Sequence, residues 1–266
     1  MTIAAKATTA GVLAAFVLAG LITPQAASAA DSPSVTGGGT LSAQEVGAAK
    51  AANDDRNDKS KDGWGGRNAT AAELKAKDAY MAAHKPKSLT SATSNMLPYV
   101  HEGQWYNNYC GPATLVMALG MRGIWGNDQG TFASWIGISP NNGGTGVDAM
   151  GKQLNDEAGG FPYVRINLPY TPTSADVAAF KNRLIGDTDV RASLVGNAME
   201  VYNGPHLVGH PNNGSTIYHW FPFQGYDGDW AAYMDSATTV WSGVPPRSGM
   251  PNSTLVTIMG GRGYNW

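Results

Sequence analysis

The sequence predicts an α+β fold in which N-terminal helices pack on a C-terminal antiparallel sheet. Between Pro112 and Ile185, apolar residues recur at helical spacing and helix-capping residues precede them. After residue 190 the pattern changes to short apolar and aromatic runs separated by glycine and proline turns, which is typical of strands. Because the helices precede the strands instead of alternating with them, we expect an α+β arrangement.

The predicted elements follow from these patterns. Helices are expected at Pro112–Arg122, Thr131–Ile136, Val147–Glu157 and Ser174–Ile185, the last with Ser174 as its cap. Strands are expected at Val190–Leu194, Met199–Val201, Tyr218–Gln224, Trp230–Met234 and Leu255–Met259, with a hairpin turn at Gly225–Asp229. A hydrophobic content of 42% is enough to bury a core beneath these elements.

Residues 1–30 have the composition of a secretory signal peptide. Lys6 gives a positive start, Ala10–Ile22 is apolar, and Ala26–Ala30 offers a small-residue cleavage site before Asp31. The apolar stretch is short for a bilayer span, and no later segment is long enough to cross a membrane. We therefore expect no membrane span after cleavage and a secreted or extracellular protein, with cell-wall association as a variant of this location.

Residues 31–95 differ from the remainder, because they are rich in Ala, Gly and charged residues and poor in large apolar ones. Ser42 with Glu45 and Thr70 with Glu73 fit helix capping boxes, which predicts two marginal helices, the second over 71–84. This segment is interpreted as a flexible extension, with a spacer favoured over a pro-segment that covers the active site. Residues 96–266 are then the folded domain.

The charge excludes one class of partner. The formal net charge is −2, and no run of Lys or Arg could form a phosphate-binding stripe. We therefore expect no binding to nucleic acid. Separately, we expect the protein to be a monomer.

The chain has a single cysteine, Cys110, so no disulfide can form within it. In an exported protein a lone cysteine is an intermolecular bridge, a buried inert residue or a functional thiol. Gly111 and Pro112 directly after it are a helix-start signal. Backbone amides and the positive end of the helix dipole meet there, and both favour a thiolate, which is a strong nucleophile.

A thiolate nucleophile requires a base, and His219 is the best candidate among the five histidines because it opens an aromatic strand. The hairpin that follows would bring Asp235, at the end of the next strand, back toward His219. A carboxylate there could hold the imidazole tautomer and stabilise its cation. Asp227 and Asp229 in the turn are weaker candidates for this third member.

Several histidines and aspartates also raise the possibility of a metal site. His206, His210 and His219 with Asp227 or Asp229 could supply ligands, but their spacing matches no zinc pattern. We therefore predict neither a metal nor another cofactor.

Gln104 stands six residues before Cys110-Gly111-Pro112-Ala113, and Asp235 stands sixteen residues after His219. With the Gly144-Thr145-Gly146 segment, these pieces resemble the peptidase C39-like family, papain-like cysteine peptidases related to bacteriocin-processing peptidases, over roughly residues 97–260. The resemblance implies a papain-like fold in which Cys110 is the nucleophile, His219 the general base and Asp235 the residue that orients it. It also implies an oxyanion hole formed by the Gln104 side-chain amide and the Cys110 backbone N–H.

Two positions depart from the family pattern. Ser236 follows Asp235 where the family usually has proline, and the strand after His219 holds Trp220, Phe221, Pro222 and Phe223 in place of a plain aliphatic run. Proline within a strand suggests an edge or a bulge.

The predicted function is a secreted cysteine hydrolase that cleaves peptide or amide bonds in peptides, proteins or peptidoglycan peptides. Two alternatives remain open. One is acyl transfer to an amine, as in transglutaminase-like enzymes. The other is an inactive binding module that uses some of the eight tryptophans and eleven tyrosines to bind cell-wall sugars or peptides.

Overall fold

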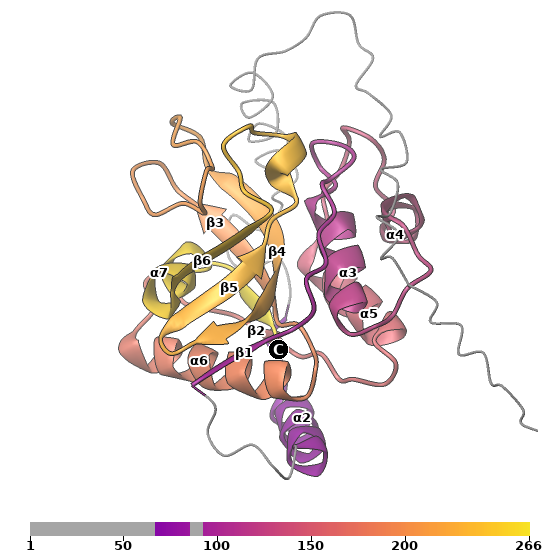
Figure 1. Ribbon diagram of the computed structural model, residues 1–266, viewed down its shortest axis with the longest axis vertical. Coiled ribbons are helices and arrows are strands. Elements are labelled where there is room, and N and C mark those ends of the chain that lie inside the picture. The colour runs from indigo at the N-terminus through magenta and orange to yellow at the C-terminus, as the bar shows by residue number, and fades with distance from the viewer. Residues whose placement is uncertain (1–66, 86–92) are drawn as a thin grey trace, which may run out of the picture. The chain divides into compact units, whose positions relative to one another are not determined.

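An antiparallel sheet, whose strands come from the second half of the chain except for β1 (Ser94–Met96), is covered by helices on both sides (Figure 1). The computed structural model describes residues 67–85 and 93–266, all within one contact unit. These residues contain six α-helices and a sheet whose pairings are all antiparallel, so the α+β prediction is confirmed.

The helices are α2 (Ala71–His84), α3 (Cys110–Met121), α4 (Gln129–Ile136), α5 (Val147–Glu157), α6 (Ser174–Asp189) and α7 (Asn252–Ile258). The strands are β1 (Ser94–Met96), β2 (Arg165–Ile166), β3 (Val195–Glu200), β4 (Ile217–Asp227), β5 (Trp230–Met234), β6 (Arg247–Pro251) and β7 (Gly263–Asn265). The strand order is β2-β7-β3-β4-β5-β6, and β1 pairs with β4. A short 3-10 helix, Ala237–Thr239, follows β5.

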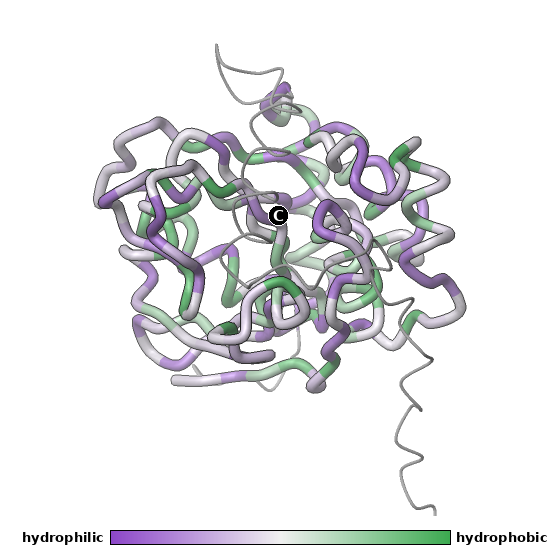
Figure 2. Tube along the Cα trace, turned by 90° about the horizontal axis from the view of Figure 1, so that it is seen from above, coloured by the Kyte–Doolittle hydropathy of each residue, from purple (hydrophilic) through white to green (hydrophobic). Residues whose placement is uncertain are grey.

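Two apolar clusters hold the helices on the sheet. Trp220 of β4 joins a cluster with α3 and α5, whereas Phe221 and Phe223 join a second cluster with α6 and α7. This division follows from the alternation of side chains along a strand. In Figure 2 apolar stretches recur in the inner helices and strands, and hydrophilic stretches recur along the outer loops.

The centre of the sheet is β4, which changes partners along its length. Its residues 217–222 pair with β3, and pairing with β5 begins at Phe223, so Pro222, which lacks an N–H, lies where one ladder gives way to the other. The register with β5 shifts between Phe223 and Gly225, which is the irregularity that a proline in this strand suggests. At Gly225 a Cβ atom would lie 2.1 Å from the Asn95 carbonyl oxygen, so glycine is required for β1 to pair there.

Two strand predictions are wrong. Leu255–Met259 was expected as a strand but lies almost entirely in α7, because a five-residue apolar run fits either element and only its packing against α6 decides. Val190–Leu194 precedes the strand, since α6 continues to Asp189 and β3 begins at Val195. The cap of α6 is Thr173, in a capping box with Asp176, and not Ser174.

The helix α2 has the predicted bounds and the predicted capping box between Thr70 and Glu73. It differs from the expected marginal helix in a flexible extension, because it is docked on the domain. Lys77 is fully buried, and its Nζ lies 3.1 Å from Asp187 Oδ1 of α6 and 3.6 Å from the Phe161 ring centroid. Composition alone could not reveal this docking, because Lys77 and the partly buried Leu74, Tyr80 and Met81 of the helix contact residues that are distant in the sequence.

The predicted signal peptide and the first helix of the extension lie outside the described residues. Within residues 67–85 and 93–266, no helix has the length and apolar character needed to cross a membrane.

Replacing Lys77 with methionine should lower the free energy of unfolding by about 3–5 kcal/mol, because Asp187 would remain buried without its cation. Burial already raises the pKa of Asp187 to about 6. Lys75→Met, on the exposed side of the same helix, is the matched control for chemical denaturation. The double variant Lys77→Met/Asp187→Asn should recover part of the loss. Equal stability of the Lys77→Met and Lys75→Met proteins would contradict docking of α2 through this pair.

Candidate active site

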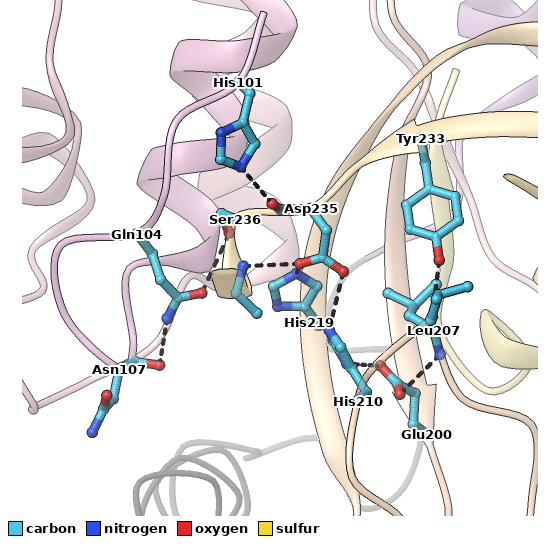
Figure 3. A network of polar contacts seen from close by, with 12 residues as sticks. His101, Gln104, Asn107, Glu200, Leu207, His210, His219, Tyr233, Asp235 and Ser236 are labelled. Atoms are coloured by element: carbon cyan, nitrogen blue, oxygen red, sulfur yellow. Dashed lines mark hydrogen bonds and ion pairs between the residues drawn. The ribbon is translucent and has the colours of Figure 1, made fainter. Parts of the chain in front are cut away.

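The centre of the site is a buried carboxylate that contacts His219. The His219 ring of β4 points its Nε2 at Asp235 Oδ1, 3.0 Å away, directly after the end of β5 (Figure 3). Both residues are buried, with 0% and 1% exposure. The hairpin therefore brings together the histidine and the aspartate that the sequence singled out.

Cys110 is the first residue of α3 and is 5% exposed. The first intrahelical hydrogen bond there runs from the Ala113 N–H to the Tyr109 carbonyl. The next residue must be glycine, because a Cβ atom on Gly111 would lie 2.0 Å from Thr145 Oγ1. The backbone carbonyl of Thr145 accepts a 2.9 Å hydrogen bond from Trp220 Nε1, so this contact ties the start of α3 to β4.

The Cys110 thiol and the His219 imidazole interact through a hydrogen bond and through charge. Burial by itself would lower the pKa of His219, but Asp235, together with a hydrogen bond and charge interaction from Cys110, raises it. Because Nε2 faces Asp235, the other ring nitrogen, Nδ1, is the atom left for the thiol. This orientation leaves Nδ1 available to take the thiol proton.

Gln104 is buried in the loop before Cys110, and its side chain is bound within that loop. Nε2 donates to the Tyr106 carbonyl at 2.8 Å and to the Asn107 carbonyl at 2.9 Å, and Oε1 accepts from Ser236 Oγ at 3.3 Å. Both amide protons therefore have backbone acceptors in this conformation. The side chain shapes the turn that leads into Cys110.

The same loop is attached to the segment after β5. His101 Nε2 donates to the Asp235 carbonyl at 2.9 Å, the Gln104 N–H donates to the Ser236 carbonyl at 2.9 Å, and Thr239 Oγ1 donates to the Gln104 carbonyl at 2.6 Å. Ser236, directly after Asp235, donates its hydroxyl proton to Gln104 Oε1. These contacts couple the thiol loop to the aspartate.

The structure adds two residues that sequence reasoning did not place in the site. His210 donates from Nε2 to the second oxygen of Asp235, Oδ2, at 3.0 Å, and from Nδ1 to Glu200 Oε1 at 2.8 Å (Figure 3). The sequence offers His210 only as a potential metal ligand, and it offers no role for Glu200. Both side chains are ionisable and buried. No local sequence pattern indicates that burial.

The two imidazoles beside Asp235 favour its ionised form. Burial by itself would raise the pKa of Asp235, yet the two neighbouring imidazoles hold it far below its ordinary range. Burial by itself would lower the pKa of His210, but Glu200 and Asp235 outweigh it and raise the value to about 10. The side chains thus alternate in charge from Glu200 through His210 to Asp235.

The other residues weighed as metal ligands are not assembled with this cluster. His206 Nδ1 faces the Gly204 carbonyl, and Asp227 and Asp229 flank the hairpin turn. Among the described residues, His210, His219 and Asp235 do place three potential ligand atoms within 4.8 Å of one another. Each Nε2 lies 3.0 Å from an Asp235 oxygen, which is a hydrogen-bond distance, so the arrangement fits shared protons.

No protein-family model and no curated protein sequence matches this chain. Among solved structures, a crystal structure of a protein from Bacillus anthracis, proposed to be a C39-like peptidase, is similar over 65% of this chain and 96% of that one. The TM-score is 0.40 and the sequence identity is 14%. A likeness of this strength does not assign the chain to a family, so the side chains of the site must indicate the function.

The stability that His210 contributes should depend on pH. A histidine whose folded pKa is raised from 6.5 to about 10 stabilises the fold fully below pH 6.5 and loses that contribution as pH rises through about 10. The difference in unfolding free energy between wild type and His210→Gln should therefore be largest near pH 6 and shrink toward pH 10. Urea unfolding at several pH values measures this, and a difference independent of pH would mean that His210 is not charged in the fold.

Proposed function

We propose that the protein is a cysteine hydrolase that cleaves peptide or amide bonds with Cys110 as nucleophile, His219 as general base and Asp235 as its orienting partner. The observation that carries the proposal is the connected set Cys110–His219–Asp235, in which a thiol at a helix N-terminus interacts with an imidazole whose far nitrogen is held by a buried carboxylate. This division between a helix-borne cysteine and a strand-borne histidine supports a papain-like arrangement.

The chemistry follows from these positions. His219 Nδ1 takes the thiol proton, and Cys110 Sγ attacks the carbonyl carbon of the scissile amide. As the C–N bond breaks, the His219 imidazolium donates that proton to the leaving amine, and a thioester remains on Cys110. Water then gives a proton to His219, its oxygen attacks the thioester, and the acid product leaves as the thiol is re-formed.

The negative oxygen formed during attack needs hydrogen-bond donors. The amides of the first turn of α3 lie at the nucleophile, where the helix dipole favours negative charge. Gln104 can add a donor if substrate exchanges for the Asn107 carbonyl, 2.9 Å from Nε2. We propose this exchange as the way in which Gln104 serves the oxyanion hole.

Because residues 1–30 are predicted to be an export signal, we also propose that the substrate lies outside the cytoplasm. Peptides, proteins and the peptide cross-links of a cell wall all offer the required amide bond. Acyl transfer uses the same first half of the reaction, with an amine in place of water at the thioester. An excess of a primary amine in the assay separates the two, since transfer yields an amide adduct of the acyl group.

The thiol of Cys110 should be activated by His219. Rates of iodoacetamide alkylation from pH 4 to 10 should show thiolate reactivity well below pH 8.5 in wild type, and His219→Ala should move the midpoint back toward about 8.5. The small reagent suits a residue that is 5% exposed, and Cys110 is the only thiol to label. Cys110→Ser should abolish hydrolysis of a fluorogenic peptide library. A wild-type midpoint near 8.5 would remove the basis of the hydrolase proposal.

Gln104→Ala should lower kcat by about 100- to 1000-fold if the amide supplies an oxyanion proton. Cys110 alkylation should change little, because alkylation forms no oxyanion. Thermal unfolding of the same variant measures the separate contribution of Gln104 to the loop. A lower Tm with normal kcat would show that Gln104 only shapes the turn.

A further inference from the structure

The Asp235 carboxylate has a second buried partner that the proposed mechanism does not use. His210 Nε2 lies 3.0 Å from Asp235 Oδ2, and its Nδ1 lies 2.8 Å from Glu200 Oε1. All three side chains are at most 1% exposed. The polar series therefore continues beyond the triad, from Asp235 through His210 to Glu200 (Figure 3).

The geometry indicates that His210 is an imidazolium. Both of its ring nitrogens face carboxylate oxygens, and an ionised carboxylate can only accept a hydrogen bond. A neutral imidazole has one N–H and could satisfy only one of them. A cation between two anions also satisfies the rule that buried charges are paired.

The loop between β3 and β4 is shaped to hold this ring. The Leu207 N–H donates to Glu200 Oε2 at 3.1 Å, and the Val208 N–H donates to the Tyr233 hydroxyl at 3.0 Å. Gly209 has φ +83°, and a Cβ there would lie 2.1 Å from the Gly243 carbonyl oxygen. The Trp241 ring covers His210, with ring centroids 4.6 Å apart. These contacts fix the ring from several elements.

We propose that His210, held by Glu200, is a positioning residue for the active site: it fixes the Asp235 carboxylate and offsets part of its charge, so that His219 can release its proton during catalysis. This inference rests on the proposed hydrolase function. The His210 and His219 ring centroids are 5.0 Å apart, so a cation on His210 disfavours a second cation on His219. Without the His210 cation, the full charge of Asp235 would stabilise the His219 imidazolium and make its Nδ1 proton harder to transfer to a leaving amine.

The titratable groups around the two rings come from several elements. Cys110 of α3 and Asp235 interact with His219, and Asp235 and Glu200 of β3 interact with His210. Two further groups contact the edge of the cluster: the Tyr233 hydroxyl of β5, through the Val208 N–H, and the His101 ring, through the Asp235 carbonyl.

The first test uses the wild-type protein, so it does not depend on a variant folding. Nitrogen-15 NMR of labelled histidine should show two ring N–H groups on His210 at pH 7. Glu200→Gln should lower the pH at which the second N–H is lost, because one of the two anions is removed. A neutral His210 ring at pH 7 in wild type would overturn the inference.

The second test measures the effect on the active site. We expect the alkylation profile of Cys110 to have an upper limb where His219 loses its proton, and His210→Gln should move this limb upward by about one pH unit or more. The peptide-hydrolysis kcat at pH 7 should fall about tenfold with KM nearly unchanged, because one pKa unit corresponds to a tenfold change in proton affinity. The matched control is His206→Gln, in the same loop, whose Nδ1 faces only the Gly204 carbonyl.

The outcomes separate the two proposals. If wild-type Cys110 shows no thiolate below pH 8.5, the hydrolase proposal fails. If wild type shows the activated thiol but a folded His210→Gln protein keeps the same upper limb, only the positioning role of His210 fails.

Discussion

A buried carboxylate needs hydrogen-bond donors for both of its oxygens, and the buried Asp235 imposes this demand on the site. Oδ1 accepts from His219 Nε2 and from the Ala237 N–H, and Oδ2 accepts from His210 Nε2. Its backbone carbonyl accepts from His101. The end of β5, the start of β4, the β3–β4 loop and the loop before α3 therefore meet at one residue.

The position of Cys110 depends on close packing around the start of α3. Gly111 lets the Thr145 side chain approach the first turn of α3, and the Thr145 carbonyl binds the indole of Trp220. Because Trp220 follows His219 on β4, this contact sets the distance between helix and strand. The nucleophile and the base are thus positioned through one shared neighbour.

Local signals predicted much of the fold, and the failures have physical causes. The capping box at Thr70 and Glu73 and the bounds of α5 were read from sequence because a helix start is specified within a few residues. The segment Leu255–Met259 was misassigned because burial against α6, not local preference, makes it helical. The docking of α2 through Lys77 also depends on a partner more than a hundred residues away.

By itself the sequence determined the place of Cys110 before a helix and the pairing of His219 with Asp235, because a helix-start signal and a hairpin act over short distances. Only the tertiary structure decided that His210 and Glu200 continue the network and that the Gln104 amide is bound to its own loop. Whether a polar side chain is buried, and which charge faces it, depends on residues far apart in the chain. No local pattern of residue types encodes that information.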